Sequence, residues 1–240
     1  MSPSICRPIN PVLRRLSLLA ALSLLVVPGS VKSAHARCDT AHAAAQDSAP
    51  SLDTILARLQ QRYDCTRSFR ANFTEEISSP GGMKRTRSGI VYFKRTALIR
   101  WEFGAPSQGL VLSDGKVVYD YEQDLNQVVE LPMNKAFKTN ATAFLLGLGN
   151  VRRDFDATSP PDKASDGLVH IVLTPKAGGD TMELGLDPQN YSIVTFTLTS
   201  QVGGVTHLKF SDVQTNVALN DSLFHFEIPS GADVVQPQAN

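Results

Sequence analysis

Residues 89–122 read GIVYFKRTALIRWEFGAPSQGLVLSDGKVVYDYE. Within this stretch Val91 and Phe93 lie two residues apart, as do Ile99 and Trp101. Successive side chains of a strand point to opposite faces of its sheet, so this spacing places each pair on one face. The stretch therefore predicts two neighbouring strands, at 89–95 and 97–103, each with an apolar face.

A tight hairpin follows these strands. The dipeptide Asp114-Gly115 separates two apolar runs, and a two-residue Asp-Gly loop is a strong short-range signal for a hairpin. Upstream, residues 69–77 alternate apolar and polar side chains before the turn Ser79-Pro80-Gly81-Gly82. Further predicted strands are 109–113, 116–121, 127–131, 168–174, 181–186, 191–199, 205–211 and 224–228. About eleven strands punctuated by regular turns predict one mainly β domain, an antiparallel barrel or strongly curved sheet.

Two helical segments accompany the strands. Ser51 offers an N-cap, and the apolar residues after it fall at helical spacing, which predicts an amphipathic helix of about fourteen residues. These apolar residues are Leu52, Ile55, Leu56, Leu59 and Tyr63. The run 139–150 is apolar on nearly all sides and predicts a short buried helix. Two helices cannot surround so many strands, so we expect them to close an opening of the sheet as a lid.

The composition is that of a globular protein that does not bind nucleic acid. Of 240 residues, 42% are hydrophobic and 19% are charged. The 23 basic residues are balanced by 23 acidic ones, whereas a phosphate-binding surface needs an excess of lysine and arginine. We therefore expect no nucleic-acid partner.

The amino terminus has the three regions of a secretory signal peptide. Arg7, Arg14 and Arg15 precede an apolar run at 16–27, and the small-residue pattern Ala34-His35-Ala36 follows. The apolar run is shorter than the ~20 residues that span a bilayer, so we expect cleavage after Ala36 and no permanent anchor. The predicted organisation is a signal peptide at 1–36, a flexible leader at 37–50 and one domain at 51–240.

Export also affects how the cysteines are interpreted. Cys6 leaves with the signal peptide, which makes Cys38 and Cys65 an even pair in an oxidising compartment. A disulfide between them would join the leader to the end of the first helix, and two free thiols are the alternative. Arg37 stands where bacterial lipidation signals carry a small residue, so we do not expect a lipid on Cys38.

The sequence lacks the usual local motifs of catalysis. It contains no Gly-x-Ser-x-Gly elbow and no His-Glu-x-x-His pair. His170, His207 and His225 fall on separate predicted strands, where single histidines more often form local hydrogen bonds than metal sites. We therefore expect no catalytic residues, no metal and no cofactor. An exported hydrolase with a triad assembled from distant positions is an alternative.

A series of segments runs through the chain in a recognisable order: Ser68-Phe69, Phe73, 89–95, 99–103, 111–116, 119–121, 144–147 and 224–228, then Pro229, Gly231 and Val234. In order and spacing, over roughly 51–235, this series resembles the LolA family of periplasmic lipoprotein carriers. The resemblance implies an unclosed antiparallel β-barrel with a helical lid over an apolar cavity. It also implies a periplasmic carrier that takes triacylated lipoproteins from an inner-membrane lipoprotein-releasing ABC transporter to an outer-membrane receptor. We expect it to be a monomer.

The resemblance and the strand faces together assign roles to residues. We expect the acyl-chain cavity to be lined by Leu59, Phe69, Phe73, Val91, Phe93, Ile99, Trp101, Phe144, Leu145 and Leu146. An ordinary filled core is the alternative for the same residues. The family arginine that matches Arg95 bonds to the lid, which implies that Arg95 is a lid latch, and an exposed strand-end arginine is the alternative. The family usually has proline directly after this arginine, whereas this sequence has Thr96.

A second binding function fits the same features. A lipid-sensing regulatory module on a related fold would bind a free lipid or signal in an apolar cavity, where a carrier binds a lipoprotein. Identifying the molecule that copurifies with the protein distinguishes the two functions, because a carrier holds an intact acylated protein and a sensor holds a free lipid or signal.

Overall fold

The computed structural model describes residues 50–95, 97–136, 144, 149–160 and 165–236. The described elements all belong to one compact unit within Ala36–Asn240. The predicted signal peptide and most of the predicted leader lie outside the described residues. Among the described residues, no helix combines the length and the hydrophobicity that a membrane-spanning helix requires.

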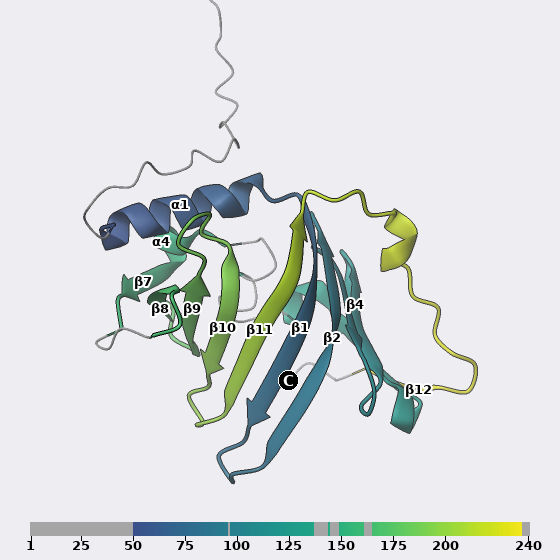
Figure 1. The fold of residues 1–240 in the computed structure, drawn as a ribbon. Helices are drawn as coiled ribbons and strands as arrows, with labels where there is room; N and C mark the ends of the chain where they lie inside the picture. Colours follow the sequence, from purple (N-terminus) through teal and green to yellow (C-terminus); the bar gives the residue numbers. More distant parts are fainter. Residues whose placement is uncertain (1–49, 96, 137–143, 145–148, 161–164, 237–240) are drawn as a thin grey trace, which may run out of the picture. The chain divides into compact units, whose positions relative to one another are not determined.

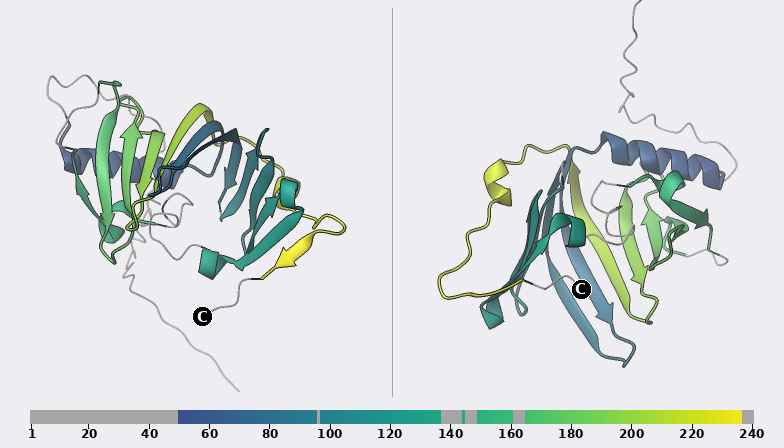
Figure 2. Two further views of the ribbon diagram at one scale, coloured as in Figure 1. Left: turned by 90° about the horizontal axis from the view of Figure 1, so that it is seen from below. Right: turned by 180° about the vertical axis from the view of Figure 1, so that it is seen from behind.

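Twelve strands form one sheet in this unit (Figure 1). From edge to edge their order is β12-β6-β5-β4-β3-β2-β1-β11-β10-β9-β8-β7, and within the described residues the two edges do not pair, so the sheet curves without closing (Figure 2). Every neighbouring pair is antiparallel except β12 with β6. This confirms the mainly β, unclosed architecture. The strands are β1 (Ser68–Ser78), β2 (Lys84–Lys94), β3 (Leu98–Phe103), β4 (Gly109–Asp114), β5 (Val117–Glu122), β6 (Gln127–Pro132), β7 (Phe155–Thr158), β8 (Val169–Pro175), β9 (Thr181–Leu186), β10 (Ile193–Thr199), β11 (Val205–Thr215) and β12 (Asp233–Val235).

Helix α1 (Leu52–Cys65) begins and ends where its sequence indicates. The Ser51 hydroxyl accepts a hydrogen bond from the Thr54 N–H at 3.3 Å, which satisfies one of the free donors of the first turn. Ile55, Leu56 and Leu59 form its buried face. The helix lies across the ends of β8, β9 and β10 (Figure 1) and packs with them into the main core.

The two faces of the sheet have different covers. We call the face that carries Ala71 and Val91 the inner face, because it packs with α1 into the main core, and the opposite face the outer face. The segment 216–232 runs along the outer face, where Leu112 and Val128 have no exposed surface. The outer face of this part of the sheet is therefore covered.

Strand predictions at the two edges of the sheet were wrong. Residues 224–228 were expected to form a strand, but Phe224 ends the short 3-10 helix η2 (Asp221–Phe224) and 225–228 belong to no strand. Phe226 packs against Tyr119 and Tyr121, with ring centroids 5.3 and 5.9 Å away, so the apolar pattern of this segment covers the sheet and does not extend it. The last strand is β12, which the sequence did not indicate. The opposite edge, β7, was missed because four residues are too few to show a period.

The predicted helix at 139–150 lies almost wholly outside the described residues. Phe144 is helical and has no exposed surface. It stacks on Tyr63 with ring centroids 4.9 Å apart and meets Phe155 edge-on at 5.6 Å, so this residue is buried as expected. The other described helices are short: α2 (Met133–Ala136), α4 (Val151–Asp154) and the 3-10 turn η1 (Gln123–Leu125).

Candidate functional site

The predicted strand residues meet on the inner face of the sheet. Phe69 lies opposite Phe93 across β1 and β2, and Phe93 lies opposite Ile99 across β2 and β3. In the next row Val91 lies opposite Trp101. Directly opposed residues of neighbouring strands share a face, so the registers bring these side chains together.

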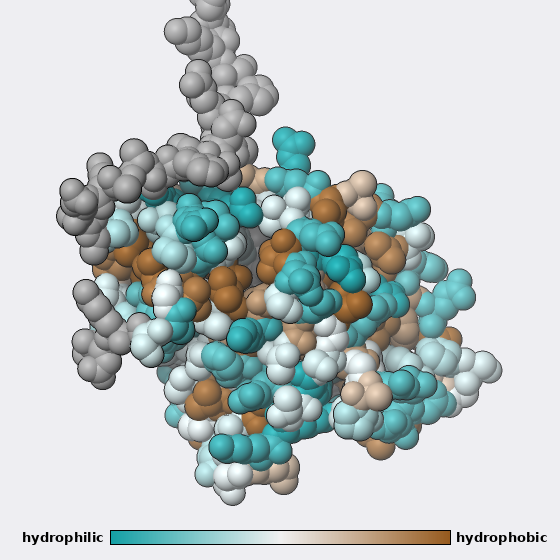
Figure 3. All heavy atoms as spheres, viewed as in Figure 1, coloured by the Kyte–Doolittle hydropathy of each residue, from teal (hydrophilic) through white to brown (hydrophobic). Residues whose placement is uncertain are grey.

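A cavity of about 110 Å³ lies beneath the carboxyl-terminal half of α1. Its wall includes four of the residues singled out from the sequence, Leu59, Phe69, Phe93 and Arg95. Apolar side chains gather just below α1 on the side of the molecule shown in Figure 3. The rest of the wall comes from α1, β1, the β9–β10 turn and β11: Arg62, Tyr63, Thr66, Ala71, Tyr191, Ser192, Ile193, Phe210, Val213 and Thr215.

The remaining residues of the expected cavity surround this hollow and are not part of its wall. They are Phe73, Val91, Ile99 and Trp101 on the strands, and Phe144. The first three are buried, and Trp101 packs edge-on against Phe73 at 4.9 Å. Leu145 and Leu146 lie outside the described residues, so their place in the cavity stays a prediction.

Two residues of the wall escaped the sequence patterns because both depend on irregular backbone. A bulge in β11, with Asp212 at φ 51°, breaks the alternation and leaves Val213 at the cavity. The Asn72 side-chain amide holds the bulge by donating to Asp212 Oδ2 at 2.7 Å. Tyr191 adopts φ 58°, and its N–H donates to Asp187 O at 2.8 Å. Bulky residues rarely occupy this backbone region, so no local pattern indicates such a turn.

Arg95 joins the sheet to the end of α1. Its guanidinium donates from Nη2 to Tyr63 O at 2.6 Å and from Nε to Thr66 O at 2.8 Å. The last carbonyl groups of a helix lack partners within the helix and carry partial negative charge, so a guanidinium suits them. Arg95 is exposed and also borders the cavity. It therefore lies at the rim and contacts the covering helix at the same time, while Thr96 lies outside the described residues.

Comparison with known proteins adds to this geometry. Residues 64–227 match the family described as Outer membrane lipoprotein carrier protein LolA. The chain belongs to the LolA family. The outer-membrane lipoprotein carrier protein of Methylobacillus flagellatus is 32% identical, over 74% of this chain and 86% of the relative. The outer-membrane lipoprotein carrier protein of Bordetella avium is 31% identical, over 92% of this chain and 97% of the relative. The crystal structure of a LolA superfamily protein from Nitrosomonas europaea is 14% identical with a TM-score of 0.41, over 74% of this chain and 99% of that one.

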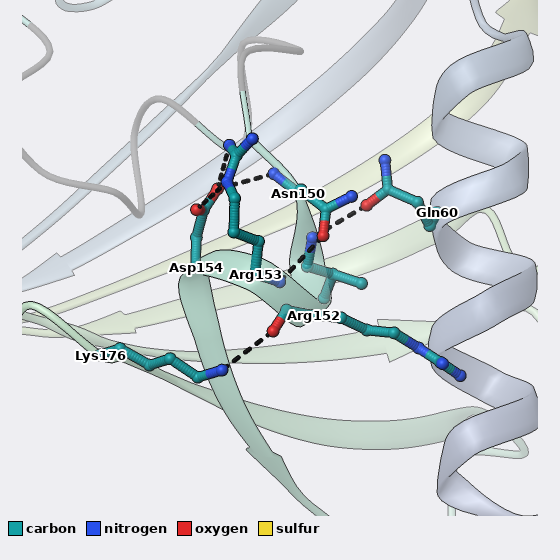
Figure 4. Close-up of polar contacts among 7 residues, drawn as sticks. Gln60, Asn150, Arg152, Arg153, Asp154 and Lys176 are labelled. Atoms are coloured by element: carbon teal, nitrogen blue, oxygen red, sulfur yellow. Dashed lines mark hydrogen bonds and ion pairs between the residues drawn. The ribbon is translucent and has the colours of Figure 1, made fainter.

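A second set of hydrogen bonds in this LolA-family chain attaches α1 to α4 (Figure 4). The Val151 N–H donates to Gln60 Oε1 at 2.9 Å, and Arg152 Nη2 donates to Asp53 O at 2.6 Å. Lys176 directly follows β8, and its Nζ donates to Arg152 O at 3.0 Å. Helix α1 is therefore held by polar contacts to α4 as well as to Arg95.

A carboxylate stabilises α4 itself. Asp154 Oδ2 accepts from the Asn150 N–H at 2.7 Å, and its Oδ1 accepts from Arg153 Nε at 2.6 Å. The Asn150 side chain in turn accepts from the Arg153 N–H at 2.9 Å and caps the helix. The hydrogen bond from the Arg153 guanidinium, and then that from the Asn150 N–H, hold the pKa of Asp154 below its usual range.

The carboxyl end of α1 carries a covalent attachment. Cys65, the last residue of the helix, is disulfide-bonded. The other two cysteines, Cys6 and Cys38, lie outside the described residues, so the pairing of Cys65 with Cys38 stays a prediction.

The inner face is apolar near α1 and charged further along the strands. Glu75 is buried on this face and accepts from Arg87 Nε at 2.7 Å, while the Arg87 guanidinium lies 4.0 Å from the ring centroid of Phe103. Loss of hydration, and then the nearby Glu122 charge, raise the pKa of Asp120 on β5, and Arg87 opposes them.

The outer face holds a second hollow of about 520 Å³ with a different lining. Charged and amide side chains contribute much of its wall. The lining residues are Arg100, Glu102, Phe103, Gln108, Gly109, Leu110, Tyr121, Gln123, His225 and Phe226.

The histidines make local contacts. His170 Nδ1 lies 2.9 Å from Glu183 Oε1, and its Nε2 lies 3.0 Å from Asp166 Oδ2. His207 Nδ1 lies 2.8 Å from the Thr197 hydroxyl. In the part of the chain that the structure describes, no group of three or more histidine, cysteine or acidic side chains is arranged to hold a metal ion.

Proposed function

We propose that this protein carries the acyl chains of triacylated lipoproteins through the periplasm. In this proposal an inner-membrane ABC transporter loads it, and an outer-membrane receptor unloads it. The observation that supports this most directly is the apolar cavity beneath α1, in a chain of the lipoprotein carrier family. The protein acts by binding and release, without catalysis or a cofactor, so the energy for loading comes from the transporter.

The need for such a carrier follows from the hydrophobic effect. Burying one methylene is worth about 0.8 kcal/mol, so exposing a long acyl chain to water costs on the order of 10 kcal/mol. A lipoprotein with three chains therefore leaves a membrane unassisted at a negligible rate. A protein that supplies apolar surface only during transit removes this barrier, whereas a permanently open apolar surface would aggregate.

The small volume of the cavity indicates how loading occurs. A cavity of about 110 Å³ is smaller than the roughly 150 Å³ that accepts one benzene molecule, and an acyl chain is much larger than benzene. We therefore infer that the structure represents the closed, unloaded form. Loading requires α1 to move away from the inner face, so that acyl chains replace the contacts of its apolar residues.

Competition between lid and cargo sets the affinity in this scheme. Closing α1 buries Ile55, Leu56 and Leu59, and burial of each such side chain is worth about 1.5 to 3 kcal/mol. Cargo gains its own burial but loses that of the helix, so its net affinity stays modest and release to an acceptor is possible. Arg95 favours the closed form because it holds the end of α1, which is the latch role that the resemblance implies.

The deciding experiment recovers the protein from the periplasm of the native bacterium and identifies what is bound to it. Intact acylated proteins support the carrier. Free lipid alone would favour the lipid-sensing module, and turnover of an ester panel would favour the hydrolase.

Depletion of the protein provides an independent measurement in the cell. A carrier predicts that outer-membrane lipoproteins accumulate in the inner membrane, because their route across the periplasm is lost. An unchanged lipoprotein distribution would contradict the proposal. Amino-terminal sequencing of the periplasmic form tests the predicted cleavage after Ala36.

A further inference from the structure

The indole N–H of Trp101 is a buried donor without an acceptor. Among the buried side-chain nitrogen and oxygen atoms of the described residues, Trp101 Nε1 alone has no hydrogen-bond partner. An indole nitrogen can only donate, and tryptophans in protein interiors usually find an acceptor. A buried polar group left unpaired in a folded protein calls for an explanation, because it loses its hydrogen bond to water and gains nothing in return.

Trp101 lies on the inner face, next to the cavity beneath α1. It stands opposite Val91 on β2, which in turn stands opposite Ala71, a residue of the cavity wall. Its indole ring meets Phe73 edge-on at 4.9 Å and Phe210, another wall residue, at 6.4 Å. The unpaired donor is therefore part of the second layer of side chains around the hollow.

Two polar groups on the inner face near Trp101 already have partners, and no described residue accepts from its indole. Glu75 accepts its hydrogen bond from Arg87. Ser113 on β4 lies opposite Ile99, two residues from Trp101 on β3. Its hydroxyl accepts from the Gly115 N–H at 3.1 Å. The rings that contact Trp101, Phe73 and Phe210, have no acceptor atoms. The acceptor that would complete this site must therefore come from outside the described residues, and a bound molecule can supply it.

We propose that Trp101 donates its indole hydrogen to an ester carbonyl oxygen of the acylated cargo. This inference rests on the proposed function, since an acyl chain must first enter the space under α1. The hydrocarbon part of such a chain has no polar atom, but each ester-linked chain ends in a carbonyl that enters the apolar environment with it. Burying that oxygen without a donor is unfavourable, so the orphan N–H and the carbonyl satisfy each other.

The contact gives Trp101 two roles in recognition. It fixes how deeply the chains penetrate, because the carbonyl must reach a donor that is held in place by Val91 and Phe73. It also distinguishes acyl esters from other hydrocarbon chains of the same length, which apolar contacts alone do poorly. Trp101 is thus a specificity-determining residue of the cavity.

The test compares two probes that differ only in this acceptor. One is a synthetic diacylglyceryl-cysteine peptide, and the other is its dialkyl ether analogue, which lacks the carbonyl oxygens. A buried hydrogen bond of ordinary strength corresponds to about a tenfold difference in affinity, so the wild-type chain should bind the ester about tenfold more tightly. In Trp101→Phe, which keeps a ring but removes the donor, this ester-to-ether ratio should fall to one or below, because the buried carbonyl then lacks a donor.

A neighbouring substitution is the matched control. Phe73→Leu alters the packing against Trp101 without touching its N–H, so it should weaken both probes together and leave the ratio at the wild-type value. The ratio cancels general effects of a substitution on packing or folding. A ratio that stays near ten in Trp101→Phe, or falls equally in Phe73→Leu, would overturn the assignment.

A spectroscopic measurement follows the donor itself. The chain contains one tryptophan, so the protein has a single indole N–H resonance. That resonance should move downfield and exchange more slowly with solvent when the ester probe binds, and it should respond less to the ether. If both probes bind equally and the resonance responds equally, the Trp101 contact is rejected while the carrier function stands. If neither probe binds, the carrier function and this inference both fail.

Discussion

Two hollows formed by the described residues differ in both size and lining. The hollow beneath α1 measures about 110 Å³ and has a mostly apolar wall, whereas the cleft on the outer face measures about 520 Å³ and includes Arg100, Glu102 and His225. A methylene group placed in the outer cleft would separate these polar groups from water. The larger hollow is therefore the poorer candidate for the acyl-chain site that we propose.

The covers of the two faces differ as well. The segment 216–232 buries Phe224 and is held by hydrogen bonds from Arg100 to Leu223 O, at 3.1 Å, and from Lys94 to Leu219 O, at 3.2 Å. It then ends in β12, which pairs with β6. Helix α1 instead lies over a void at its carboxyl end. A cover above a void gives up fewer contacts when it moves, so we expect α1 to open and the outer segment to stay.

The strongest test of this difference removes an anchor of the outer cover. Phe224→Ala should lower the free energy of unfolding by about 3 kcal/mol, because it deletes a large buried ring. Lipopeptide affinity of the folded protein should stay the same, since the substitution lies on the other face. Chemical denaturation and a binding titration measure the two quantities, with the less buried Phe226→Ala as the milder control. Loss of affinity without loss of stability would reverse our assignment of the covers.

A matched pair of acidic substitutions distinguishes the hollows themselves. Phe69→Asp places a carboxylate in the wall beneath α1 and should weaken lipopeptide binding about a hundredfold, because the charge must be desolvated or the chain kept out. Leu110→Asp places the same group in the outer cleft and should change the affinity less than about twofold. Thermal unfolding checks that both variants fold. Equal losses in the two variants would show that lining does not identify the site.

Removing the contact at the end of α1 should have a smaller effect. Arg95→Leu deletes two charged hydrogen bonds to α1 while leaving the fold intact. Because the side chain is exposed, we expect the equilibrium between closed and open forms to shift by about 1.4 kcal/mol toward the open form. Cargo should then bind about tenfold more tightly, and hand-over to the receptor should be correspondingly slower.

Arg95→Lys separates charge from geometry in this contact. An ammonium group lacks the planar fork that reaches two carbonyls, so this variant should be intermediate. Unchanged transfer kinetics in Arg95→Leu would exclude a latch at this position.

The smallest effect concerns α4, the short helix to which α1 is attached. The pKa of Asp154 is lowered in the folded protein, so its contribution to stability is present above the unfolded value of about 3.9 and is lost as the pH falls through the lower folded value. Asp154→Asn should therefore lower the free energy of unfolding by about 0.5 kcal/mol at neutral pH. The value is small because Arg153 is well exposed. At pH values near 3 the loss should be smaller still. Denaturant unfolding at the two pH values measures this, and a pH-independent difference would contradict it.

Much of the fold is predictable because its determinants are local. The N-cap at Ser51 and the apolar spacing after it defined α1, and the Asp114-Gly115 loop defined the β4–β5 hairpin. In that hairpin Asp114 Oδ1 accepts from the Lys116 and Val117 N–H groups at 2.7 and 2.8 Å, which is a local reason for the turn. By contrast, β12 pairs with a strand far away in the sequence, so its three residues carry no pattern that predicts it.

The candidate site was predictable only in part. Residue spacing and a family resemblance both pointed to Leu59, Phe69, Phe93 and Arg95, and these residues border the cavity. Tyr191 and Val213 were missed because a left-handed residue and a bulge re-aim a side chain without any repeated signal. The partners of Arg95, two backbone carbonyls at a helix end, also have no signature in the sequence.

By itself the sequence determined helix α1, the central strands with their faces, and the family, because period, capping and turn chemistry act between residues close in the chain. Tertiary structure decided which of two hollows is apolar, where α1 ends against Arg95, and that the indole N–H of Trp101 faces no acceptor among the described residues. Each of these depends on how distant strands curve around one another, and that curvature results from the packing of the whole sheet against its covers.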